Sequence, residues 1–174
     1  MSIADRLKEA GFKPEVSTEG EWQPYNGTYR CTIKALRVER DEKNACDFVQ
    51  AEYDIEETLE GDPKRDSKYP AFRKRYYMDF ENPTDAHLEN VKKLSNAVFT
   101  ATGLELDYTD KQSFIASAAA CIGLDIYIRA WGWKPEKDVK GNAIAEENQK
   151  TIQQFSVVKK EVAEKKRSSN SVAF

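Results

Sequence analysis

Apolar and polar residues alternate along most of this chain, which is the pattern of β-strands with one buried face. The alternation predicts five strands, and turn residues such as Asn26-Gly27 separate them. Between the third and fourth strands the period changes to that of a helix. The expected strands are Thr28–Arg40, Asp47–Leu59, Tyr69–Phe80, Gly123–Trp133 and Thr151–Lys159.

Three segments carry helical signals. Ser2–Ala10 begins with a capping serine, and its apolar residues recur at helical spacing. A longer helix is expected from about Pro83 to Thr102, where Gly103 stops it, and a shorter one over Lys111–Cys121. Two helices between strands three and four are the chain order of an OB-fold. We therefore expect a mainly β fold with a helical insert (α+β), built as a five-stranded OB-fold barrel.

Composition divides the chain into three expected parts. Residues 1–21 form an N-terminal helix and lead-in, and residues 22–160 form the OB-fold domain. Residues 161–174 are lysine-rich and then rich in serine, so we expect a disordered basic tail.

The third expected strand combines cations with aromatic rings. Alternation places Arg73, Arg75 and Tyr77 on one face, away from the apolar residues. Guanidinium groups beside a flat ring can hold a phosphate backbone and stack a base. Lys74 interrupts the apolar face of the same strand, and we expect it at the mouth of the barrel as a further nucleic-acid contact.

The fourth expected strand repeats this combination. One of its faces carries Tyr127, Arg129, Trp131 and Trp133, and Lys134 follows directly. For each ring taken alone, a place in the core is as good an interpretation. Two strands with arginine between aromatics favour binding: rings stack bases, and Arg129 and Lys134 contact phosphates.

Charge limits the kind of nucleic acid. The net charge is −3, so no global basic field attracts a duplex. The cations are instead clustered between Lys64 and Arg75. This pattern favours a local groove for single strands.

The sequence offers few candidates for catalytic residues. The chain has a single histidine, His87, which we expect to be exposed, and neither a phosphate-binding glycine loop nor a nucleophile with a base is readable. Asp54 and Glu56 share a strand face, yet no further ligand at metal spacing supports a closed site. We therefore expect a non-enzyme without cofactor or metal, and keep a small metal-dependent nuclease as a less favoured alternative.

The expected location is the cytoplasm. Three cysteines without close spacing favour a reducing compartment. The first residues do not resemble a signal peptide, and no apolar run approaches the roughly 20 residues of a membrane span.

Particular residues add a resemblance to this pattern. They are Pro24–Tyr29 at the start of strand one, Arg75–Phe80 on strand three, the helix ending near Gly103, Gly132-Trp133 and Asn142–Phe155. Over about Trp22–Lys159 the chain resembles a family of phage-encoded OB-fold single-stranded DNA-binding proteins, formerly a domain of unknown function. The resemblance implies sequence-tolerant binding of single-stranded DNA in phage DNA replication, recombination or repair, in the host cell cytoplasm.

The tail departs from a common pattern. Many bacterial-type single-strand binders end in an acidic tail with a final Pro-Phe, whereas here Lys165, Lys166 and Arg167 precede Ala173-Phe174. The tail is a candidate contact for replication or recombination proteins, or for DNA phosphates. Both a monomer and a homodimer stay open. The main alternative is a protein-interaction or structural phage component, because Trp, Tyr and Arg also dominate protein interfaces.

Overall fold

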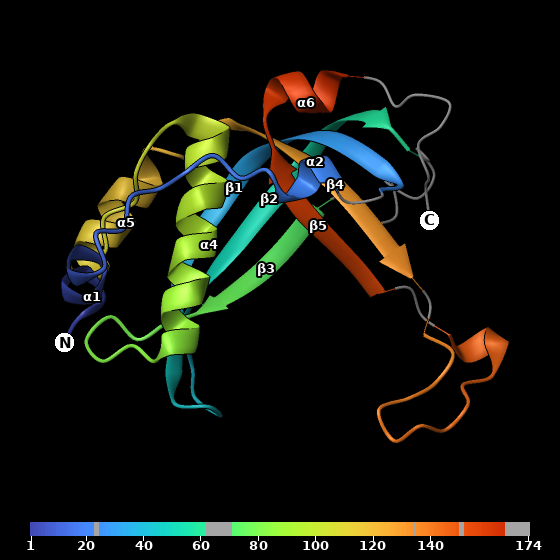
Figure 1. Ribbon diagram of the computed structural model, residues 1–174, viewed down its shortest axis with the longest axis horizontal. Coiled ribbons are helices and arrows are strands. Elements are labelled where there is room, and N and C mark those ends of the chain that lie inside the picture. The colour runs from blue at the N-terminus through green and yellow to red at the C-terminus, as the bar shows by residue number, and fades with distance from the viewer. Residues whose placement is uncertain (23–24, 62–70, 134, 150–151, 166–174) are drawn as a thin grey trace.

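The computed structural model describes residues 1–22, 25–61, 71–133, 135–149 and 152–165, and its elements follow the expected order. Figure 1 shows one layer of strands with helices against it. The helices are α1 (Ile3–Glu9), α2 (Glu19–Trp22), α4 (Asp85–Thr102), α5 (Lys111–Ala119), the 3-10 turn η1 (Glu146–Asn148) and α6 (Lys160–Glu164). The strands are β1 (Gly27–Asp41), β2 (Cys46–Glu60), β3 (Ala71–Tyr77), β4 (Asp125–Trp133) and β5 (Ile152–Val158).

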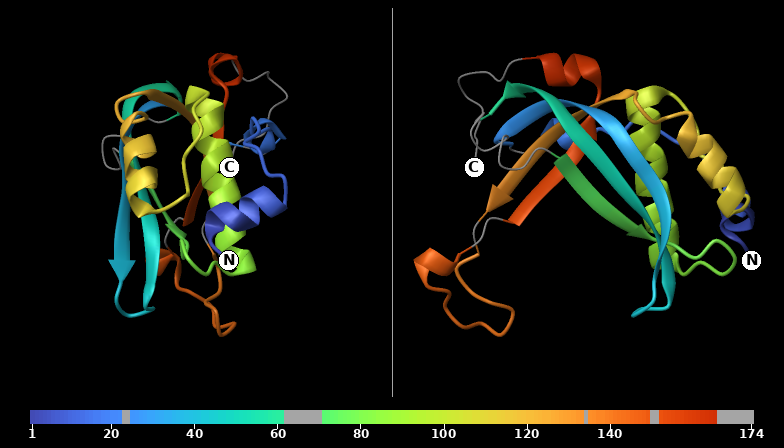
Figure 2. Two further views of the ribbon diagram at one scale, coloured as in Figure 1. Left: turned by 90° about the vertical axis from the view of Figure 1, so that its left-hand side faces the viewer. Right: turned by 180° about the vertical axis from the view of Figure 1, so that it is seen from behind.

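The five strands form one antiparallel sheet in the order β3-β2-β1-β4-β5. The α+β prediction with five strands is therefore confirmed. Strands β1 and β2 are long and curved (Figure 2), and their pairing shifts register beside Thr28/Tyr29, Arg30/Cys31 and Ile33/Ala35 of β1. Each shift inserts a residue on one strand, which bends the ladder and increases its twist.

The sheet is not closed into a barrel by backbone pairing. Within the described ranges, β3 pairs only with β2, and β5 pairs only with β4. Aromatic side chains bridge the two outer strands instead. Phe72 of β3 and Phe155 of β5 have ring centroids 5.1 Å apart, and the Tyr53 ring contacts Phe155 edge-on at 6.1 Å.

Helices α4 and α5 lie on one face of the sheet and enclose the core with it (Figures 1 and 2). Thr84 caps α4: its hydroxyl accepts the N–H of His87, whose ring Nδ1 accepts the N–H of Thr84 in return. The helix ends at Gly103, whose φ of 72° is the left-handed conformation that glycine adopts without strain. The two caps therefore define where α4 begins and ends.

Two boundaries differ from the sequence-based prediction. Strand β3 ends at Tyr77, and Met78 and Phe80 continue into the core outside regular pairing. Residues 160–164, mostly assigned to a disordered tail, form helix α6, because Ala163 is buried with Val158 and Tyr127 in a second apolar cluster. Residues 166–174 lie outside the described residues.

Candidate nucleic-acid interface

The outer face of the β1–β2–β3 half of the sheet gathers cations and rings. Arg73 and Arg75 are exposed and Tyr77 is half-buried, and all three point away from buried Phe72 and Tyr76. The antiparallel register sets them opposite Glu52, Gln50 and Phe48 of β2. The alternation predicted for strand three is therefore confirmed, and the binding role of this face stays a prediction. We call the set Arg37, Phe48, Gln50, Glu52, Arg73, Arg75 and Tyr77 the arginine face.

Arg37 belongs to this face, although simple alternation from Tyr29 would turn it toward the core. The register shift between Ile33 and Ala35 changes the phase of β1, so that Leu36 is buried and Arg37 is exposed. Arg37 pairs with Gln50 across the ladder. A bulge is the reason why sequence reasoning missed this cation, since no local residue signal marked it.

Glu52 joins two of the three arginines. Its Oε1 lies 3.2 Å from Nη2 of Arg37 and 3.4 Å from Nε of Arg73. Only 9% of Glu52 is exposed, so this carboxylate is largely withdrawn from solvent while both guanidinium groups remain exposed. Arg37 also contacts Glu39 at 3.3 Å. The carboxylates therefore hold these arginines in place and compete with any bound anion.

Arg75 is held by neutral groups. Its Nε donates to Oε1 of Gln50 at 3.2 Å, and its guanidinium lies 4.6 Å from the centroid of the Phe48 ring. Within the described part of the chain, no carboxylate forms an ion pair with it. Phe48, 4% exposed, also packs against the Tyr77 ring at 5.4 Å. Arg75 is thus a positioned cation whose charge is not neutralised by these neighbours.

The hydroxyl of Tyr77 is anchored at the β1–β2 hairpin, where it donates to Oδ2 of Asp41 at 2.9 Å. This hydrogen bond, together with those from the backbone and side chain of Asn44, lowers the pKa of Asp41. The amide of Asn90 holds the Tyr77 carbonyl from α4. Both ends of the residue are therefore positioned before any ligand arrives.

Lys74 lies on the other face of β3, where its Nζ is 5.1 Å from the centroid of the Tyr76 ring. It is exposed, beside the unpaired gap between β3 and β5. The sequence placed it at a barrel mouth, and the structure places it at the open edge of the sheet.

On β4, two predicted contacts are covered rather than open. Tyr127 and Arg129 are each 7% exposed. Arg129 donates to the carbonyls of Gly20 (3.5 Å) and Val162 (3.0 Å), and its guanidinium lies 4.2 Å from the Tyr25 ring. The expectation that these residues form an exposed binding face is wrong, because α2 and α6 pack over them.

Trp131 shares this side of β4 and is half-buried. The side chain of Trp133 and all of Lys134 lie outside the described residues, so their predicted roles stay predictions. Strand β4 pairs with β1 at Gly27–Thr32, whereas Arg73–Tyr77 of β3 lie across β2 from Ala35–Glu39 of β1. The two aromatic sets therefore occupy different halves of the sheet and do not form one continuous site.

Two connecting segments extend away from the sheet. The β1–β2 hairpin and the segment 135–149 before β5 extend to the same side (Figures 1 and 2). In the latter, Asp138 accepts the N–H groups of Lys140 and Asn142, and both Lys137 and Lys140 are exposed.

The acids considered for a metal have other partners. Asp54 pairs with Lys34 at 3.9 Å, and Glu56 accepts from the Thr32 hydroxyl at 2.9 Å. No group of three or more His, Cys, Asp and Glu suited to a metal occurs within the described ranges. His87 closes the α4 cap, and its Nε2 lies 3.6 Å from Sγ of Cys46.

None of the helices in the described ranges has both the length and the apolarity needed to cross a bilayer.

No protein-family model matches this chain, and no curated protein matches it significantly.

Proposed function

We propose that this protein binds single-stranded DNA on the arginine face, without sequence preference. The observation that carries the proposal is that Arg37, Arg73 and Arg75 share one sheet face with the contacting rings of Phe48 and Tyr77, and that Arg75 lies over the Phe48 ring. Cations along a groove hold the backbone, and a ring accepts any base because every base has a π-face. Binding on this face is non-catalytic and involves no cofactor in this proposal.

The fold supports the same proposal. Five antiparallel strands with two helices between β3 and β4 have the chain order of an OB-fold, in which strands two and three form the ligand face. We propose that the sheet is an opened OB barrel, in which the Phe72–Phe155 contact replaces backbone closure. With the resemblance of Trp22–Lys159, this supports a role in phage DNA replication, recombination or repair in the host cytoplasm.

The direct test is a fluorescence-anisotropy titration of dye-labelled oligo-dT at low and high salt, beside a labelled hairpin duplex of equal length, because the tryptophans of the chain lie outside the arginine face. We expect tight, salt-dependent binding of oligo-dT and much weaker binding of the hairpin, because stacked bases in a duplex cannot reach Tyr77. Equal affinity for both would contradict the proposal.

Arg75→Ala locates the site, with Arg30→Ala as its control. Arg30 lies on the other half of β1 and pairs with Glu57 at 3.2 Å and Asp125 at 3.7 Å. Only Arg75→Ala is expected to weaken oligo-dT binding. An equal loss in both variants would show attraction by general charge instead of a defined face.

The alternative is a protein partner on the same surface. Its support is the residue type, because arginine and tyrosine are enriched among interface hot spots. An absence of oligo-dT binding at low salt would favour this alternative.

A further inference from the structure

The unpaired gap between β3 and β5 contains a small polar pocket. Its volume is about 150 Å³, and β3, β5 and α4 supply most of its walls. Its charged lining residues are Lys74 from β3, Lys93 from α4 and Glu19 from α2. The pocket therefore opens at the edge of the strand whose outer side carries the arginine face.

The two lysines bring more positive charge than their surroundings balance. Within the described residues, no carboxylate lies within 4.0 Å of Nζ of Lys74 or Lys93. Partial burial, and then the charge of Lys93, lower the pKa of Lys74, while the charge of Glu19 opposes the shift. Two ammonium groups that disfavour each other would be stabilised by an anion between them.

Neutral hydrogen-bonding groups complete the lining. Ser17 and Ser156 also line the pocket, and Asn96 is held there because its Oδ1 accepts the N–H of Glu15 at 2.9 Å. Drug-sized ligands occupy pockets of roughly 300–1,000 Å³, so this pocket suits a much smaller group.

We propose that this pocket binds a phosphate group through Lys74 and Lys93. The shared chemistry is a phosphate oxyanion, whose source is either a phosphodiester of a bound strand or free phosphate. For the first source the inference rests on the proposed function. Arg73 and Arg75 lie on one side of the edge strand β3 and Lys74 on the other, so a single strand would cross this edge and place one phosphate in the pocket.

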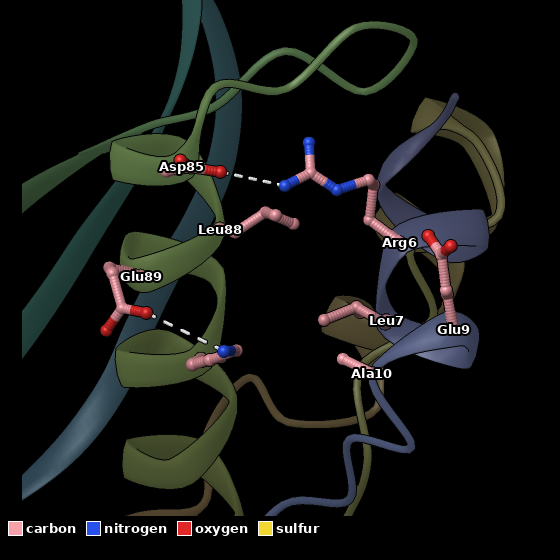
Figure 3. Close-up of a pocket in the computed structure, with 8 residues that line it drawn as sticks. Arg6, Leu7, Glu9, Ala10, Asp85, Leu88 and Glu89 are labelled. Atoms are coloured by element: carbon pink, nitrogen blue, oxygen red, sulfur yellow. Dashed lines mark hydrogen bonds and ion pairs between the residues drawn. The ribbon is translucent and has the colours of Figure 1, made fainter.

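Lys93→Ala tests the path of the strand, and Lys92→Ala is the matched control. Both remove one charge from the same helix, yet Lys92 lines the groove between α1 and α4 and contacts Glu89 at 3.6 Å. In that groove Arg6 and Asp85 form the 2.8 Å pair that joins the two helices (Figure 3). Lys93 is exposed, so its truncation leaves the core intact.

The salt slope is the slope of the logarithm of the binding constant against the logarithm of the salt concentration. With an oligo-dT of about 16 nucleotides, Lys93→Ala should reduce the size of this slope by roughly 0.7, the value for one phosphate contact on a single strand. The ratio of the wild-type affinity to the Lys93→Ala affinity should then fall roughly 2.6-fold between about 50 and about 200 mM salt. An oligo-dT of about 4 nucleotides, which fills only the arginine face, should bind both proteins equally. Lys92→Ala should match the wild type in every titration.

Inorganic phosphate tests the pocket without DNA. Amide NMR signals of Ala97 and Ser156 should shift to saturation in the wild type and in Lys92→Ala, and not in Lys93→Ala. If the wild type binds oligo-dT but Lys93→Ala keeps its slope and phosphate shifts neither amide, the inference is overturned. If phosphate shifts these amides but no oligo-dT binds, the phosphate site stands and the proposed function fails.

Mixed results are also decisive. Saturating phosphate shifts with an unchanged slope in Lys93→Ala would support a site for free phosphate and overturn the strand path. A reduced slope without phosphate shifts would support the phosphodiester as the ligand and overturn the free ion.

Discussion

The Tyr77 hydroxyl donates a 2.9 Å hydrogen bond to Oδ2 of Asp41, which ties the last residue of β3 to the end of β1. The bond crosses the β1–β2 hairpin, and the Tyr77 ring packs on Phe48 of β2 at 5.4 Å. A ring held at its hydroxyl and along one side has little rotamer freedom left to lose on stacking a base. The contact therefore favours Tyr77 as a preorganised stacking platform.

Tyr77→Ala and Tyr77→Phe separate the ring from its anchor. Tyr77→Ala should weaken oligo-dT binding by about 1–3 kcal/mol, because one stacking ring is lost. Tyr77→Phe should keep most of the affinity, and the pKa of Asp41, measured by NMR titration, should rise toward its ordinary value. Equal affinity losses in both variants would mean that the hydroxyl, not the ring, contacts the DNA.

Glu52→Gln should strengthen oligo-dT binding at low salt. The carboxylate holds Arg37 and Arg73 and competes with phosphate for both, and an amide of the same shape removes the negative charge that competes. Fluorescence titration measures the gain, and Asp54→Asn, which makes the same change at a neighbouring acid paired with Lys34, is the control. Weaker binding in Glu52→Gln would show that the carboxylate's positioning of the arginines outweighs its competition.

Arg129→Ala should destabilise the fold and leave the salt slope of DNA binding unchanged. It removes hydrogen bonds from a charged donor to Gly20 and Val162 and a cation–π contact with Tyr25, at a cost of about 3 kcal/mol. Chemical denaturation measures the loss, and titration of the residual folded protein measures the slope. A reduced salt slope with unchanged stability would instead show that Arg129 contacts the DNA.

Features set by local alternation could be predicted from the sequence, whereas features set by contacts between distant segments could not. The outer face of β3 was predictable because an edge strand with one face on the core shows its alternation directly, as Phe72 and Tyr76 against Arg73 and Arg75 do. Arg37 was not, because a bulge shifts the phase of β1 without a local signal.

The covering of β4 was beyond the same reasoning. Alternation correctly separates Tyr127 and Arg129 from Ile126 and Ile128, but both faces of this strand are buried. The second cover comes from α6, a five-residue helix in a segment whose composition is typical of a disordered tail. Closure of the barrel likewise depends on whether β3 and β5 pair. These strands are far apart in the sequence, so the alternation within each of them does not determine whether they pair.

Asp47 should make part of the protein's stability depend on acid pH. Burial raises the pKa of this carboxyl, but hydrogen bonds from Lys111 at 2.6 Å and Arg40 at 3.3 Å outweigh it, so the pKa of Asp47 is lowered overall. A lowered folded-state pKa means that the stabilisation is complete above the unfolded value of about 3.9 and is lost as pH falls through the folded value. Asp47→Asn should therefore cost about 1.5–3 kcal/mol at neutral pH, since two charged donors lose an ionised acceptor.

The same variant gives the pH test. The difference in unfolding free energy between wild type and Asp47→Asn should narrow as pH drops below about 4, because protonated Asp47 and asparagine are then both uncharged. Denaturant unfolding at several pH values measures this difference. Asp110→Asn, a change at the cap of α5 beside Lys111, controls for general effects on that helix. A difference that stays constant down to pH values well below 4 would show that the cost of Asp47→Asn comes from packing instead of charge.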